Sequence, residues 1–298
     1  MIVSKLATVP FTFRKIKYNL LFTLIVGTCI SYITNKYNHI IPEIPVTISA
    51  FLGTAISILL SFKMNQSYDR WWEARKIWGS IVNDSRSLVI QLQSFFKQEQ
   101  SSGMIKRLTY RQIAWCYSLS QTLRGLDPFL YTQDLLSQED MDYLLTQQNI
   151  PLGILNLNAR EINDFIDKNS IDPISKVHLN SILIQLINSM GKAERINSTV
   201  FPMTYRLVLH FTIYLFVIIL SISLQNIPMY MEVPILVLIS IVFFMLDKTA
   251  DNLQDPFRNR PSDTPMLSIC NTIEINLRQL ISEDDVSVDS QPETFYLL

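Results

Sequence analysis

The sequence predicts an all-α membrane protein that has four transmembrane helices per subunit and a large helical cytosolic domain. Two observations support this class. Long runs without a charged residue occur in two pairs, and the region between the pairs carries apolar residues at three- and four-residue intervals. The composition agrees, because 17% of the residues are charged and the mean hydropathy is +0.21, whereas soluble domains are about 25% charged.

The first pair of spans is predicted at residues 18–62. Residues 18–35 and 44–62 contain no charged side chain, and helices of these lengths cross most of a hydrocarbon core about 30 Å thick. The short segment between them makes the pair a hairpin. Residues 1–17 before the hairpin are expected to be a cytosolic N-terminus.

The second pair of spans is predicted at residues 206–247. Residues 207–231 are uncharged, while residues 233–246 form a shorter apolar run that Asp247 ends. A run of this length is also typical of a buried core helix. The partner span directly before it favours a fourth transmembrane helix.

Basic residues near the spans predict the orientation of the chain. Before the first span and after the second stand Lys5, Arg14, Lys15, Lys17, Lys63, Arg70, Arg75 and Lys76. The two loops on the other side of the membrane hold only Lys36. Because positive loops stay in the cytoplasm, we expect a helical cytosolic domain at residues 63–205 and a cytosolic C-terminal segment at residues 248–280. The acidic residues 281–298 are expected to form a disordered tail.

The second span differs from the others because one of its faces is small and polar. At about 100° per residue, the members of this face are Thr47, Ala50, Thr54, Ser57 and Ser61. The residues expected to face lipid on the opposite side are Ile48, Leu52, Ile56 and Leu59. The polar face has two interpretations: close packing against another helix, or a central pathway bordered by Thr54, Ile58 and Phe62, which are spaced by four.

A dense cluster of charges and tryptophans follows the second span, within Ser61–Gly79. Its members are Arg70, Trp71, Trp72, Glu73, Arg75 and Trp78. An aromatic belt with surface ion pairs at the membrane interface would explain part of this cluster. Two adjacent tryptophans followed by EAR and WG are more specific than a belt requires, so we expect the cluster to anchor the helix at the cytosolic boundary.

Three stretches of the chain, in order, resemble the bestrophin family and its bacterial branch in particular. They are FKMNQSYDRWWEARKIWGSIVNDSRSL from Phe62, GKAERINSTVFPMTYRLVLHFTIYLF from Gly191 and DNLQDPFRNRPSDTPMLSICNTIEINLRQL from Asp251. The resemblance implies an ion channel that assembles as a homopentamer around a central pore, with both termini in the cytosol. It also implies a multi-pass protein of the cell membrane, the inner membrane of a bacterium. Its partners would be its own subunits, the bilayer and permeant monovalent ions.

The resemblance further implies a hydrophobic neck, lined by three apolar side chains one turn apart on the second span. Matched on the phenylalanine of FKMN, the neck positions are Thr54, Ile58 and Phe62, and Thr54 departs from the apolar pattern of the family. The resemblance also implies a second narrowing in the cytosolic vestibule, and the best candidate for it is Ile174. The alternative is that Ile174 is a core isoleucine after Pro173.

Animal members of the family carry a calcium clasp, an acidic run soon after an Asn-Pro-Phe site. In this chain the site reads Asp255, Pro256 and Phe257. Arg258 and Arg260 stand where oxygen ligands would be needed, which leaves only Asp263. We therefore expect no calcium activation of this type, and neither a bound metal nor a cofactor.

Several classes of function are disfavoured by the sequence. A net charge of −1 gives no basic field for nucleic acid, and the three distant cysteines match no disulfide or zinc pattern. No phosphate loop or catalytic motif is present, so an enzyme is not expected.

Two classes of function remain. One is an ion channel, with monovalent cations as the expected ions and anions such as chloride as the alternative. The other is a membrane-anchored scaffold or accessory protein without transport. His210, early in the third span, could serve the pore or could be a neutral imidazole bonded to a neighbouring helix.

Overall fold

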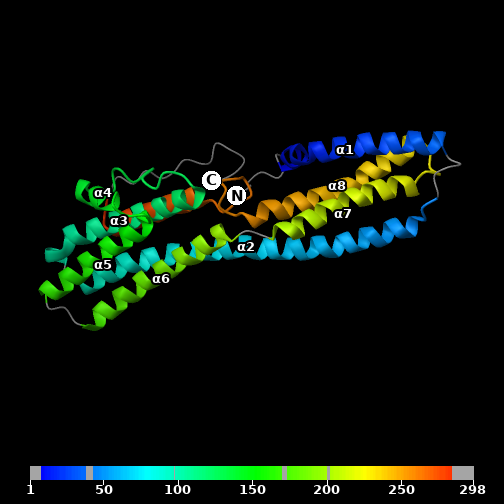
Figure 1. Ribbon diagram of the computed structural model, residues 1–298. Helices are drawn as coiled ribbons and strands as arrows, with labels where there is room; N and C mark the ends of the chain where they lie inside the picture. The colour runs from blue at the N-terminus through cyan, green and yellow to red at the C-terminus, as the bar shows by residue number, and fades with distance from the viewer. Residues whose placement is uncertain (1–7, 38–42, 97, 170–172, 200–201, 284–298) are drawn as a thin grey trace. The chain divides into compact units, whose positions relative to one another are not determined.

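The computed structural model describes residues 8–37, 43–96, 98–169, 173–199 and 202–283, and within them α-helices joined by turns and loops are the only regular secondary structure (Figure 1). The helices are α1 Thr8–Lys36, α2 Val46–Phe95, α3 Gln98–Arg124, α4 Gln138–Leu144, α5 Ile150–Asn169, α6 Pro173–Ser198, α7 Met203–Ser223, α8 Met229–Gln254 and α9 Met266–Leu280. The predicted all-α class is confirmed for this part of the chain.

The chain divides into two compact units. The first takes its described residues from 2–71 and 200–255, and we call it the span unit. The second takes them from 72–199 and 256–298, and we call it the helical body. Helix α2 is continuous and contributes its first part to the span unit and its second part to the helical body.

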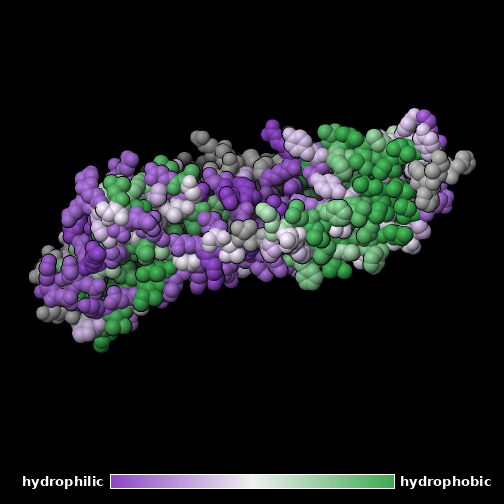
Figure 2. All heavy atoms as spheres, viewed as in Figure 1, coloured by the Kyte–Doolittle hydropathy of each residue, from purple (hydrophilic) through white to green (hydrophobic). Residues whose placement is uncertain are grey.

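In the part of the chain that the structure describes, four helices are long and apolar enough to cross a membrane. Their candidate spans are Phe13–Lys36, Val46–Phe95, Met203–Ser223 and Met229–Gln254. Apolar residues gather on the surface of the helices labelled α1, α7 and α8 (Figure 2), as expected for a surface that meets lipid. Helix α8 extends past the short apolar run seen in the sequence, which explains how that run belongs to a full span.

Close approach between helices holds the span unit together. A Cβ added to Gly53 would lie 3.3 Å from Cε2 of Phe216, so α2 and α7 pack closely at this point. The hydroxyls of Ser49 and Ser223 are 2.8 Å apart and join the same two helices. Small residues at these positions therefore serve helix packing, as is common in membranes.

The apolar face of α2 that was expected to meet lipid is instead part of the core of the span unit. Ile56 is fully buried, and Leu52 and Leu59 pack against the same cluster of α7 and α8 side chains. Only Ile48 on that face is exposed. The prediction was wrong because periodicity identifies which residues share a face but not what covers it.

The helical body is built around α3, which packs against α5, α6 and α9. Trp115 of α3 and Trp78 of α2 are both fully buried in its core. The C-terminal α9 belongs to the same core as α2 and α3. Glu283 lies in the predicted disordered tail, yet it accepts a hydrogen bond from the Tyr110 hydroxyl and pairs with Lys106. The rest of that tail, residues 284–298, lies outside the described residues.

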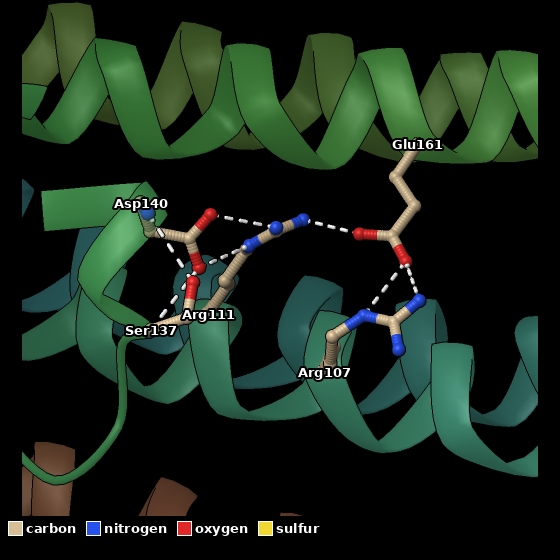
Figure 3. A network of polar contacts seen from close by, with 5 residues as sticks. All are labelled: Arg107, Arg111, Ser137, Asp140 and Glu161. Atoms are coloured by element: carbon tan, nitrogen blue, oxygen red, sulfur yellow. Dashed lines mark hydrogen bonds and ion pairs between the residues drawn. The ribbon is translucent and has the colours of Figure 1, made fainter. Parts of the chain in front are cut away.

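Arg111 joins three helices of the body (Figure 3). Its Nε and Nη2 donate to Asp140 of α4 at 3.0 and 2.7 Å, and its Nη1 donates to Glu161 of α5 at 2.5 Å. Burial alone would raise the pKa of Asp140, but the hydrogen bonds and charge of Arg111 hold it below its usual range. We call Arg111, Asp140 and Glu161 the Arg111 clamp.

Replacing Arg111 with methionine should lower the free energy of unfolding of the body by about 3–5 kcal/mol, because the buried Asp140 loses its guanidinium partner and Glu161 is left with Arg107. Thermal unfolding of the purified protein measures this loss. Arg107→Met is the matched control, since Arg107 also bonds Glu161 but its side chain is 59% exposed. Equal stability losses for the two variants would contradict a clamp centred on Arg111.

Candidate pore-lining site

Thr54, Ile58 and Phe62 form one exposed stripe along α2. Phe62 is 60% exposed and Ile58 is 54% exposed, although both are large apolar side chains. Within the span unit, the buried positions of α2 lie on the other side of the helix, at Ser49, Ile56, Leu60, Lys63 and Ser67. The three predicted neck residues therefore share the side of α2 that the span unit leaves uncovered.

The hydroxyls beside this stripe are satisfied by their own helix. Thr54 donates its hydroxyl to the carbonyl of Ala50 at 2.9 Å, and Ser57 donates to the carbonyl of Gly53 at 2.8 Å. Such bonds to the preceding turn let hydroxyl residues lie in a membrane helix without a polar partner helix. The polar face of α2 thus needs no second helix to satisfy these two groups.

Lys63, directly after Phe62, is completely buried. Its ammonium lies 2.8 Å from Oδ1 of Asp247 and 2.7 Å from Oδ1 of Asp251, both on α8. Asp247 is also bonded through Oδ2 to Nε2 of His210 on α7, at 2.7 Å. We call these four residues the Lys63 cluster. For His210, the structure supports the interpretation of an imidazole bonded to a neighbouring helix.

The Lys63 cluster was not predicted from the sequence. In the sequence, Lys63 is a basic residue that flanks the second span, and Asp247 is the charged residue that ends the fourth apolar run. The missed signal was that the charges at the ends of the second and fourth spans are opposite in sign. Because 184 residues separate Lys63 and Asp247, no local pattern could connect them.

The cluster is a salt bridge that already contains its cation. The ligand atoms of His210, Asp247 and Asp251 lie within 4.8 Å of one another, a grouping that could hold a metal ion by residue type. The Lys63 ammonium is bonded to both carboxylates, so it supplies the positive charge there. A divalent cation would have to displace it.

Further cations meet the C-terminal turn of α8. Lys15 of α1 donates to Oδ1 of Asn252 at 3.0 Å, and Nε of Arg70 donates to the carbonyl of Gln254 at 2.9 Å. The last carbonyls of a helix have no partner within the helix and carry partial negative charge. Positive side chains from α1 and α2 therefore suit this end of α8.

The residues of the tryptophan and charge cluster have different surroundings. Trp78 is fully buried in the core of the helical body. Glu73 pairs with Lys76 at 2.5 Å, and Trp72 and Arg75 are exposed. Trp78 and Glu73 thus have contacts within one chain; for the motif as a whole, a role in anchoring or assembly stays a prediction.

Ile174 is the second residue of α6 and its side chain is 65% exposed. The alternative that it is a core isoleucine is therefore wrong for the single chain. Val177, one turn later, is exposed to a similar extent, so α6 begins with an apolar surface. The exposure is compatible with a narrowing at Ile174 but does not identify one.

Asp263, the one acidic residue left from the calcium clasp pattern, is used inside its own loop. Its carboxylate accepts the backbone N–H of Arg260 at 3.0 Å and the hydroxyl of Ser262 at 3.3 Å. Its side chain is nearly fully buried, and this burial raises its pKa. The guanidinium of Arg260 lies 3.7 Å away, so a positive group already accompanies this carboxylate.

Calcium should therefore have no effect through this loop. We expect the melting temperature of the purified protein to be the same in millimolar calcium and in a chelator, because Asp263 offers no open set of oxygen ligands. The Asp263→Asn variant should show the same indifference. A melting temperature that rises with calcium in the wild type and not in Asp263→Asn would contradict this expectation.

The fold and this site define a class: a multi-span helical membrane protein that holds a buried lysine between two aspartates and leaves a stripe with two large apolar side chains open along one span. The family follows from sequence comparison. The profile of the Bacterial/Fungal Bestrophin protein family matches residues 11–279, so the chain belongs to the bestrophin family. The resemblance seen in the three sequence stretches is confirmed.

Individual relatives cover nearly the whole chain. Voltage-dependent anion channel-forming protein YneE of Escherichia coli O157:H7 is 32% identical over 284 residues, which are 95% of this chain and 92% of that protein. Its Salmonella typhi counterpart is 34% identical over 249 residues, 84% and 81% of the two chains. A crystal structure of a bacterial bestrophin homolog from Klebsiella pneumoniae is 30% identical with a TM-score of 0.85, and covers 90% of this chain and 99% of that one.

Proposed function

We propose that the protein is a homopentameric ion channel that conducts small monovalent ions through a central pore. The observation that carries this proposal is the exposed stripe of Thr54, Ile58 and Phe62 on α2. A closed ring of identical subunits would bring five copies of the stripe around one axis. The names of the relatives, which describe channel-forming proteins and not enzymes, support the same function.

In this proposal the stripe is a hydrophobic neck. Rings of Ile58 and Phe62 side chains make a narrow apolar passage, where water is poorly hydrogen-bonded and the pore can close by dewetting. Thr54 adds a ring of hydroxyl groups at the extracellular end. Ile174 is the candidate for a second narrowing, formed by the start of α6.

The proposed topology follows the positive-inside rule. The spans belong to the residue ranges 18–35, 44–62 and 206–247. Both termini and the helical domain at residues 63–205 would lie in the cytoplasm of a bacterium, with the channel in the inner membrane. The C-terminal segment, residues 248–280, would lie on the same side.

The charge of the permeant ion has two candidates. Cations are our first proposal, because Lys63, the positive charge next to the neck, is buried and neutralised by two aspartates and adds no positive field to the pore. Anions are the second, because the relatives are named for anion channels. The neck itself carries no charge and cannot select by Coulomb attraction.

Purified protein in liposomes should conduct ions, and Phe62→Ala should increase the unitary conductance because it widens one of the two proposed apolar rings. Single-channel recording measures both results, and gel filtration verifies that the oligomer is intact. Ile48→Ala is the matched control, an exposed apolar residue of α2 outside the stripe. A scaffold or accessory protein would show no ion flux in any variant, and that result would reject the channel proposal.

Reversal potentials in asymmetric NaCl separate the two ions. For a cation channel the reversal potential moves toward the equilibrium potential of sodium, because chloride carries little of the current. A shift toward the chloride equilibrium potential would reject cation selectivity and leave the channel architecture unaffected.

A further inference from the structure

We propose that Lys63 and its aspartate partners on α8 form an anchor that sets the rotation of α2 about its axis, and so aims Phe62 at the pore. The anchor makes Lys63 a positioning residue for the neck. This inference rests on the proposed channel function and adds to it a residue that never touches the permeant ion. Its evidence lies entirely within the span unit.

The geometry of adjacent residues links the anchor to the neck. Consecutive side chains of an α-helix point about 100° apart, so the direction of Lys63 determines the direction of Phe62. Lys63 is fully buried against α8, whereas Phe62 is 60% exposed. Turning α2 by one residue in one sense would bring the Lys63 ammonium to the exposed position that Phe62 now holds, and in the other sense it would bring Phe62 to the buried position of Lys63.

Apolar packing alone would define this rotation less sharply. Ile56 and Leu60 bury apolar groups against α7 and α8, and such contacts are not directional. The ammonium of Lys63, in contrast, is within 2.8 Å of Asp247 and 2.7 Å of Asp251. Withdrawing one partner of a buried ion pair leaves the other charge uncompensated, so alternative rotations of α2 are strongly disfavoured.

The partners of Lys63 are themselves held in place. Asp247 is almost completely buried and is bonded to His210 of α7, and Lys248 lies 3.7 Å from Asp251. Tyr205 of α7 donates its hydroxyl to the carbonyl of Leu59, one turn before Lys63, at 2.6 Å. Helices α7 and α8 thus both bond to the part of α2 that carries Phe62, at the end of the neck opposite Thr54.

The anchor is tested by a functional double-mutant cycle with Phe62. The pair Lys63→Met and Asp247→Leu replaces the two fully buried ions with apolar side chains, an exchange that proteins often tolerate, and Asp251 keeps Lys248 as its positive neighbour. This double variant is compared with the wild type, and again in a Phe62→Ala background. Lys106→Met is the control, because it removes an ion pair between the exposed Lys106 and Glu283 in the helical body, away from both proposed narrowings in the sequence.

If Lys63 acts through the neck, the double variant should change the unitary conductance by at least about threefold with the oligomer intact. The same change should be close to absent in the Phe62→Ala background, because contacting residues of one unit are coupled and distant ones are additive. Lys106→Met should leave the conductance unchanged. An equal change in both backgrounds, or no change in either, overturns the proposal.

A milder variant tests the anchor in case the double variant does not fold. Asp251→Asn removes one of the two carboxylates and keeps the bond between Lys63 and Asp247. It should change the conductance in the same direction by a smaller factor, again only when Phe62 is present. An Asp251→Asn effect that persists in Phe62→Ala overturns the anchor. Absence of current in the wild type rejects the channel function itself, and the anchor with it.

Discussion

The span unit depends on the pairing of one buried positive charge. An ammonium without access to water is costly unless carboxylates compensate it, and Lys63 meets two of them on α8. The neighbouring elements follow from this requirement. Helix α7 brings His210 to Asp247, and α1 brings Lys15 to Asn252 on the next turn of α8. Apolar surfaces supply most of the buried area, while these polar contacts specify which turn faces which.

The helical body uses the same principle with a different cation. There the planar guanidinium of Arg111 divides its donors between Asp140 of α4 and Glu161 of α5. Arginine suits a position between two elements because its donors are fixed in several directions, whereas lysine is a compact charge on a flexible stem. Lys63 accordingly reaches two carboxylates of a single helix, and Arg111 ties two helices to a third.

Local patterns predicted the helices and the spans, because charge-free runs and helical periodicity lie within one segment. They did not predict the Lys63 cluster or the Arg111 clamp, whose partners are distant in sequence. Periodicity also assigned the apolar face of α2 to lipid, although Ile56 is buried among neighbouring helices. The exposed residues of one chain include Thr54, Ile58, Phe62 and Ile174. Their proposed roles in the pore depend on contacts with other copies of the chain in the proposed channel.

The back-bonded hydroxyls of α2 give its open face an asymmetric chemistry. The hydroxyls of Thr54 and Ser57 donate their hydrogens to carbonyls of the preceding turn. Their oxygen lone pairs therefore remain available to accept hydrogen bonds from outside the helix. At these two positions the surface accepts hydrogen bonds and does not donate them. Water beside it would orient its hydrogens toward the helix, and a dehydrating ion would find oxygen ligands there but no donors.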